Sequence, residues 1–159
     1  MKTTANKTLR LILGDQLNAN HSWFAKTDGS VTYVLMEVRT ETDYAQHHIQ
    51  KVVGFFAAMR SFAEELKNKK HNVIYLTIGD RENLQHIDEN CLSLIRKYGF
   101  QKFEYLLPDE YRMDEHLTSF TANLDIPFSV IDTEHFYCKR DELKEMFEKN
   151  KTFIMESFY

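Results

Sequence analysis

The chain has 159 residues, with 20 Lys and Arg residues against 24 Asp and Glu residues and a formal net charge of −4. A hydrophobic share of 43% and a charged share of 28% indicate one folded globular domain and argue against disorder. The acidic balance disfavours a freestanding nucleic-acid binder, and no apolar run reaches membrane-spanning length. The two cysteines, Cys91 and Cys138, have no partner at metal spacing. We therefore expect a soluble, cytoplasmic protein that contacts neither nucleic acid nor membrane.

The first part of the chain predicts two strands and a long helix. Residues 9–13 form a short apolar strand that stops at Gly14. Residues 18–30 form a polar connection, interrupted by Trp23 and Phe24, in which a short helix or an irregular loop would both fit. The second strand, residues 31–38, is almost continuously apolar, as in sheets covered on both faces. Apolar residues at helical spacing then predict a helix over residues 43–69.

The second part repeats the alternation of strands and helices. We predict strands at residues 72–78, 102–107 and 127–132, and helices at 113–124 and 139–149. A further helix follows Asp80, its expected N-cap, and ends at Gly99 in a left-handed cap. The alternation predicts an α/β fold: a Rossmann-like, doubly wound parallel sheet of about five strands, in the order 3-2-1-4-5, with helices on both faces.

The end of the first strand is the first candidate ligand edge. Gly14 allows close backbone approach, Asp15 can accept hydrogen bonds, and Gln16 can both donate and accept. Ligands of open α/β sheets lie at the carboxyl ends of the strands. Asp15 could equally cap the following turn, so both interpretations stay open. The chain has neither a G-x-G-x-x-G nor a G-x-x-x-x-G-K-[ST] pattern, which excludes the usual dinucleotide fingerprint and phosphate loop.

The end of the second strand supplies a second group, formed by Glu37, Glu41 and Tyr44. Several acids and no lysine at this edge disfavour a phosphate ligand. Carboxylates that accept from hydroxyls, beside a stacking ring, favour a neutral, flat, polyhydroxylated ligand. The alternative is a solvated loop with a core tyrosine.

Other polar groups lie near the same edge. His47 and His48 are adjacent, so on a helix they point about 100° apart and do not share a metal. Lys51 follows one turn later. Residues 109–112 come after the fourth strand, and we expect Arg112 to pair with an acid. We find no nucleophile with a supporting base.

Taken in order, these motifs resemble the N-terminal α/β domain of the photolyase-related proteins, in particular the branch of iron–sulphur bacterial cryptochromes and prokaryotic (6-4) photolyases. The resemblance covers nearly the whole chain, with residues 1–152 as the domain and residues 153–159 as the start of a connection to a helical domain. It is carried by residues 13–17, 36–38 and 57–66, by Glu41, Tyr44, His47, His48, Lys51, Pro108 and residues 110–112, and by the aromatic segment 153–159.

The resemblance implies a role in light capture. Full-length relatives repair ultraviolet DNA lesions or sense blue light, with FAD and a four-cysteine iron–sulphur cluster in the helical domain. These 159 residues have only two cysteines, neither in a cluster motif, and lack a segment similar to the helical domain. The domain is therefore not expected to be catalytic alone. The expected cofactor is an antenna, 6,7-dimethyl-8-ribityllumazine, which passes excitation energy to the flavin. Its implied binding residues are Gly14, Asp15, Gln16, Met36, Glu37, Val38, Glu41, Tyr44, His48 and Phe55. If Phe55 points inward, its ring would fill the pocket that a smaller aliphatic side chain leaves open, and the domain would bind no antenna.

Two other functions remain as alternatives. One is a stand-alone nucleotide-binding or stress-type α/β protein that dimerises through its aromatic C-terminus. The other is a small enzyme that uses Asp15, Glu37 and the histidines as acid–base groups. The antenna hypothesis implies two partners: a small chromophore and the helical FAD domain of a longer parent chain.

Overall fold

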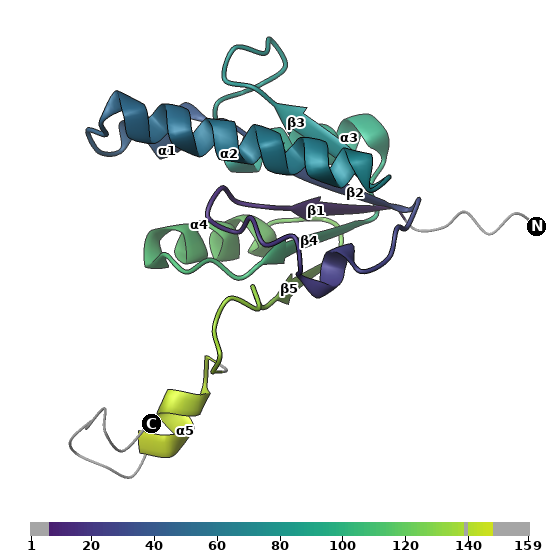
Figure 1. The fold of residues 1–159 in the computed structure, drawn as a ribbon. Coiled ribbons are helices and arrows are strands. Elements are labelled where there is room, and N and C mark those ends of the chain that lie inside the picture. Colours follow the sequence, from purple (N-terminus) through teal and green to yellow (C-terminus); the bar gives the residue numbers. More distant parts are fainter. Residues whose placement is uncertain (1–6, 139, 148–159) are drawn as a thin grey trace, which may run out of the picture.

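A five-stranded parallel sheet forms the centre of the domain (Figure 1). A computed structural model describes residues 7–138 and 140–147. The strands are β1 (Thr8–Leu11), β2 (Val31–Met36), β3 (Asn72–Leu76), β4 (Lys102–Leu106) and β5 (Phe128–Ile131). Their order is β3-β2-β1-β4-β5, and every neighbouring pair is parallel. The predicted fold class and strand order are confirmed.

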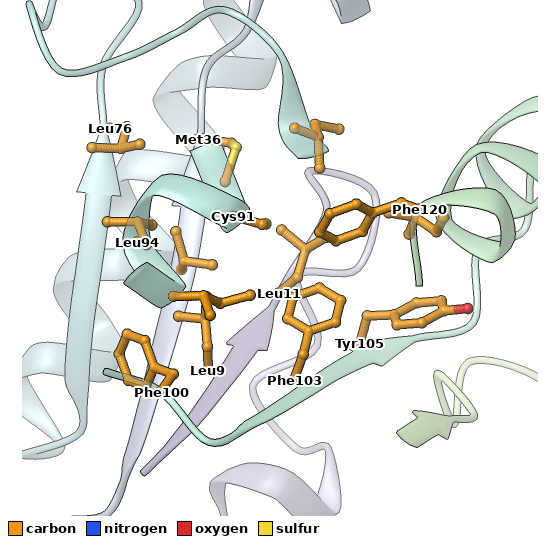
Figure 2. Close-up of a cluster of buried hydrophobic side chains, with 14 of the residues drawn as sticks. Leu9, Leu11, Met36, Leu76, Cys91, Leu94, Phe100, Phe103, Tyr105 and Phe120 are labelled. Carbon is orange, nitrogen blue, oxygen red and sulfur yellow. The ribbon is translucent and has the colours of Figure 1, made fainter. Parts of the chain in front are cut away.

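Helices cover both faces of the sheet because its strands carry apolar residues on both sides. On one face, α3 (Ile87–Tyr98) and α4 (Tyr111–Ala122) pack on β1 and β4. Figure 2 shows this cluster, in which Leu9 and Leu11 lie near Phe103, Cys91 and Phe120. On the other face, α2 (Ile49–Asn68) buries Met59, Phe62, Ala63 and Leu66.

The connection after β1 covers the part of the second face that α2 leaves free. It contains a single 3₁₀ turn, η1 (Ser22–Phe24), and is otherwise irregular. Its Trp23 lies over the guanidinium of Arg10, 4.7 Å from the ring centroid. Arg10 in turn pairs with Glu104 of β4 at 2.7 Å and donates to the hydroxyl of Tyr33. Arg10, a charged residue of β1, is therefore covered by the ring of Trp23 and not by a helix.

Two predicted helix starts are wrong. The expected helix over residues 43–69 begins only at Ile49, because His48 is extended and its side chain accepts from the Gln50 N–H as the α2 N-cap. A separate short helix, α1 (Arg39–Asp43), precedes it. Asp80 does not begin the next helix. Its carboxylate accepts from the Thr77 N–H at 2.6 Å, and α3 begins only at Ile87.

The last described helix, α5 (Glu142–Phe147), lies apart from the sheet in Figure 1. The predicted helix end at residues 148–149, the aromatic segment 153–159 and residues 1–6 lie outside the described residues, so the predicted domain boundary at 152 stays a prediction. No helix among the described residues is both long and apolar enough to cross a bilayer.

Two glycines in helical positions should respond in opposite ways to alanine. Gly99 ends α3 with φ +65°, as predicted, and an added Cβ there strains the backbone. Gly54 lies inside α2, where an added Cβ meets nothing within 4 Å. We expect Gly99→Ala to lower the free energy of unfolding by about 1 kcal/mol and Gly54→Ala to raise it by about 0.5–1 kcal/mol. Urea denaturation checks both, and a change of the same sign in both variants would contradict the assignment.

Candidate functional site

A cavity of about 230 Å³ opens where β1, β2 and β4 end. Its floor is apolar and comes from residues 11–13 after and within β1, from Met36 and Val38 around β2, and from Ile87 and Met113 in the first turns of α3 and α4. The first three turns of α2 form one wall, with Phe55, Phe56 and Met59. Polar side chains also line the cavity: Asp15, Glu41, Thr42, Tyr44, His47, Lys51 and Glu110. The cavity lies at the sheet edge that the sequence indicates.

Gly14 is required by the close approach of α2 to β1. A Cβ built on Gly14 would lie 2.3 Å from Cε1 of Phe55 and 2.9 Å from the sulphur of Met59. The ring of Phe55 therefore points inward and packs against the backbone after β1. Phe55 nevertheless keeps 42% of its surface exposed, whereas Met59 is buried.

Asp15 lines the cavity beside Gly14. Although the residue reaches solvent, partial removal of its carboxylate from water raises its pKa, and the negative charges of Asp109 and Glu110 act in the same direction. A hydrogen bond from its own backbone and the positive field of His135 work against them. As a carboxylate at the cavity wall, Asp15 can accept hydrogen bonds from a ligand.

Gln16 is fully buried and does not line the cavity. Its side-chain oxygen accepts from the Leu13 N–H at 3.0 Å, and its amide nitrogen donates to the carbonyl of Leu106 at 3.1 Å. Because it joins the end of β1 to the end of β4, its present bonds hold the sheet edge together.

Glu37 is also buried and lies outside the cavity lining. Its carboxylate accepts from Nε and Nη2 of Arg60 at 2.6 and 2.9 Å, from the hydroxyl of Tyr75 at 2.7 Å and from the Ile78 N–H at 2.9 Å. Burial alone would raise the pKa of Glu37, but these hydrogen bonds outweigh it and hold the pKa below its usual value. Asn83 binds the carbonyl of the same residue at 2.7 Å.

Glu41 and Tyr44 form part of the cavity wall, and both contact Arg112 of α4. Nη2 of Arg112 lies 2.7 Å from Glu41, and Nε lies 2.9 Å from Glu110. The guanidinium carbon lies 4.3 Å from the centroid of the Tyr44 ring. The expected pairing of Arg112 with an acid is confirmed, with two acids rather than one.

The start of α2 separates the two histidines. His48 caps the helix and is absent from the cavity lining, whereas His47 lines the cavity, with its ring 5.3 Å from the Tyr44 ring. Nζ of Lys51 lies 3.5 Å from Nδ1 of His47. The expectation that this edge has no lysine is therefore wrong, because one turn of helix brings Lys51 onto the wall. Within the described parts of the chain, no group of three or more His, Cys, Asp or Glu side chains could hold a metal ion.

Several residues that line the cavity are not among the binding residues predicted from the sequence. Ile87 and Met113 begin the helices that follow β3 and β4, and Pro108 ends β4. Their positions in the chain could have identified them, because the first turn of a helix that follows a parallel strand lies at the carboxyl edge of the sheet. Phe56 and Met59 belong to the inward face of α2 that helical periodicity does identify.

The fold and cavity define a doubly wound α/β domain with a ligand-type cleft at its strand ends. The family model for deoxyribodipyrimidine photo-lyase-related protein matches residues 10–159. A curated (6-4) photolyase of Agrobacterium fabrum (strain C58 / ATCC 33970) is 31% identical over 155 residues, which cover 95% of this chain and 30% of that protein. The chain belongs to the photolyase-related family, and it spans about a third of the length of this relative.

The close approach at Gly14 predicts coupled effects on stability. Gly14→Ala should lower the free energy of unfolding by about 1–3 kcal/mol, because the new Cβ overlaps the Phe55 ring and the Met59 sulphur. In a Phe55→Ala background the same change should cost less, since the nearest atoms are gone. Urea denaturation of the two single variants and the double variant measures the coupling. Additive effects would show that Phe55 does not pack on Gly14 in solution.

The lowered pKa of Glu37 predicts that the free energy of unfolding falls at acid pH. Because its folded-state pKa lies below the usual value of 4.5, its contribution is complete above that pH and is lost as the pH falls through the folded-state pKa. We expect Glu37→Gln to cost about 1.5–3 kcal/mol at pH 7 and to flatten the decline of stability below about pH 4.5. Denaturation between pH 7 and 3 tests this, with Glu82→Gln as the exposed ion-pair control. A constant gap between Glu37→Gln and the parent at every pH would contradict the linkage.

Proposed function

We propose that the cavity binds 6,7-dimethyl-8-ribityllumazine, and that this domain serves as the antenna module of a photolyase-related flavoprotein. The observation that carries the proposal is the composition of the cleft: an apolar floor after β1 and β2, an aromatic wall from α2, and a polar rim. A fused ring can lie against the apolar part, while hydroxyls of a ribityl chain can donate to Asp15 and Glu41. The resemblance noted from the sequence implies the same ligand class.

The fit of such a ligand depends on Phe55. The cavity volume of about 230 Å³ lies below the roughly 300–1,000 Å³ usual for small-molecule sites. The ring of Phe55 occupies space directly over Gly14, and its other side faces solvent. We therefore propose that Phe55 limits the affinity for the lumazine without changing the polar contacts that select it.

Light-driven chemistry would need cofactors bound by a second domain in a longer protein. FAD and the iron–sulphur cluster would belong to a helical domain, and the antenna would pass its excitation energy to the flavin there. The role of this chain is to bind and orient the chromophore and to exclude water from one of its faces. Repair or light sensing by the complete protein is part of the proposal, because the chain spans only 30% of the Agrobacterium relative.

The position of Lys51 is the one observation that favours the nucleotide-binding alternative. A lysine on the cavity wall could bind a phosphate, which the acid-rich rim otherwise disfavours. AMP and ATP should therefore be titrated beside the lumazine. Tighter binding of either nucleotide, lost in Lys51→Met, would favour the alternative over the antenna role.

A titration tests the proposed function directly. We expect the lumazine fluorescence to change on addition of the 159-residue chain, with Phe55→Ala binding about tenfold more tightly because the cavity is enlarged. Asp15→Asn should weaken binding in the same background if the carboxylate accepts ligand hydroxyls. Isothermal calorimetry and a thermal shift provide independent readouts. Absence of binding by both the parent and Phe55→Ala at about 100 µM lumazine would overturn the antenna proposal.

A further inference from the structure

We propose that Arg112 is a positioning residue that closes residues 39–48 over the cavity from outside it. This inference rests on the proposed function in one respect only: it takes the cavity to be the ligand site. Arg112 itself does not line the cavity, whereas three side chains that it contacts, Glu41, Tyr44 and Glu110, do.

The guanidinium of Arg112 joins two chain segments that are far apart in sequence. Toward the segment after β2, Nη1 and Nη2 lie 3.2 and 2.7 Å from the two carboxylate oxygens of Glu41. Toward the turn before α4, Nε and Nη2 lie 2.9 and 3.2 Å from those of Glu110. Lysine could not reproduce this arrangement, because only the planar fork of arginine holds two carboxylates with paired donors.

An aromatic contact extends the link to the start of α2. The Tyr44 ring lies 4.3 Å from the guanidinium carbon, within the range of a cation–π interaction. The same ring meets His47 edge-on at 5.3 Å, and His47 contacts Lys51. One arginine on α4 is thereby connected to the polar side chains that residues 41–51 contribute to the cavity.

The segment between β2 and α2 has few other attachments among the described residues. Its start is held by Gln85, which accepts from the Arg39 N–H and whose carbonyl accepts from the hydroxyl of Thr40. The α1 helix buries none of its residues, and its N-cap Val38 makes no side-chain capping bond. Residues 43–46 are exposed. The contacts of Arg112 therefore carry most of the closure of this segment.

Removing Arg112 would also change the charge of the cavity wall. Glu41 and Glu110 share one guanidinium, so the trio carries a single net negative charge. Without the arginine, the two carboxylates at the cavity wall would be uncompensated and would repel each other. Because the partners are partly exposed, the attraction is moderate and screened by salt, which suits a contact that opens and closes.

Hydrogen exchange of the ligand-free 159-residue chain tests the closure without any ligand. We expect amide exchange at residues 41–44 to be about threefold to tenfold faster in Arg112→Gln, and intermediate in Arg112→Lys, which keeps the charge but not the paired bonds. Raising the salt from about 0.05 to 0.5 M should accelerate exchange there in the parent chain, because it screens the attraction between Arg112 and the two acids. In Arg112→Gln the same salt should not accelerate exchange, because only the repulsion between the two carboxylates is left to screen.

The matched control is Arg140→Gln. Arg140 also bridges two acids, Asp109 and Asp132, and lies near an aromatic ring, that of Phe136, but it contacts a different segment. Its loss should leave exchange at residues 41–44 unchanged. Equal exchange in the parent and Arg112→Gln, or the same increase in both arginine variants, would overturn the proposal.

Ligand kinetics supply the readout that a purely structural role would not move. With 6,7-dimethyl-8-ribityllumazine in a stopped-flow instrument, Arg112→Gln in the Phe55→Ala background should raise both the association and the dissociation rate constants, with the larger rise in dissociation. Unchanged rate constants in a protein that binds would overturn the gating role. If neither the parent nor Phe55→Ala binds the lumazine, the proposed function fails, and exchange alone decides whether Arg112 closes the segment.

Discussion

The buried carboxylate of Glu37 is the constraint on which the arrangement of the site depends. It stands where β2 ends and accepts hydrogen bonds from α2 through Arg60, from β3 through Tyr75 and from the following loop through Ile78. A buried carboxylate is costly unless all of its lone pairs find donors. Because the three donors come from separate elements, satisfying Glu37 fixes the helix, the sheet and the loop relative to one another.

Gln16 plays the corresponding part at the neighbouring strand ends. By accepting from the Leu13 N–H and donating to the Leu106 carbonyl, it spans the gap where β1 and β4 stop pairing. Buried amides keep such a role only when both ends are bonded, and here both are. Gly14 beside it admits the Phe55 ring. Of the motif residues 14–16, Asp15 is left to present its side chain to the cavity.

The sheet could be predicted from the sequence, and the exact helix starts could not. Continuous apolar runs such as Val31–Met36 and a helix ended by Gly99 are local patterns with a direct physical meaning. The capping of α2 by His48 depends on one hydrogen bond that no periodicity reveals. The loop before α3 is held by side chains such as Asn83, which donates to the Glu37 carbonyl 46 residues away. Long-range polar bonds of this kind also hide which acids are buried, so Glu37 looks like a ligand-facing residue in sequence.

The cavity has a floor that is held by buried groups and a wall whose side chains are partly exposed. The apolar floor and the strand ends are fixed by buried groups, Glu37, Gln16 and Met59. Several features that would set ligand size and polarity lie instead on residues 41–55, and they depend on a half-exposed ring, Phe55, and on ion pairs that reach solvent through Arg112. Side chains with a solvent-facing surface can change position at little cost, whereas the packed floor cannot. Substitutions in the wall formed by residues 41–55 could therefore change which ligand the cavity would accept, while the bonds that build the sheet edge stay the same.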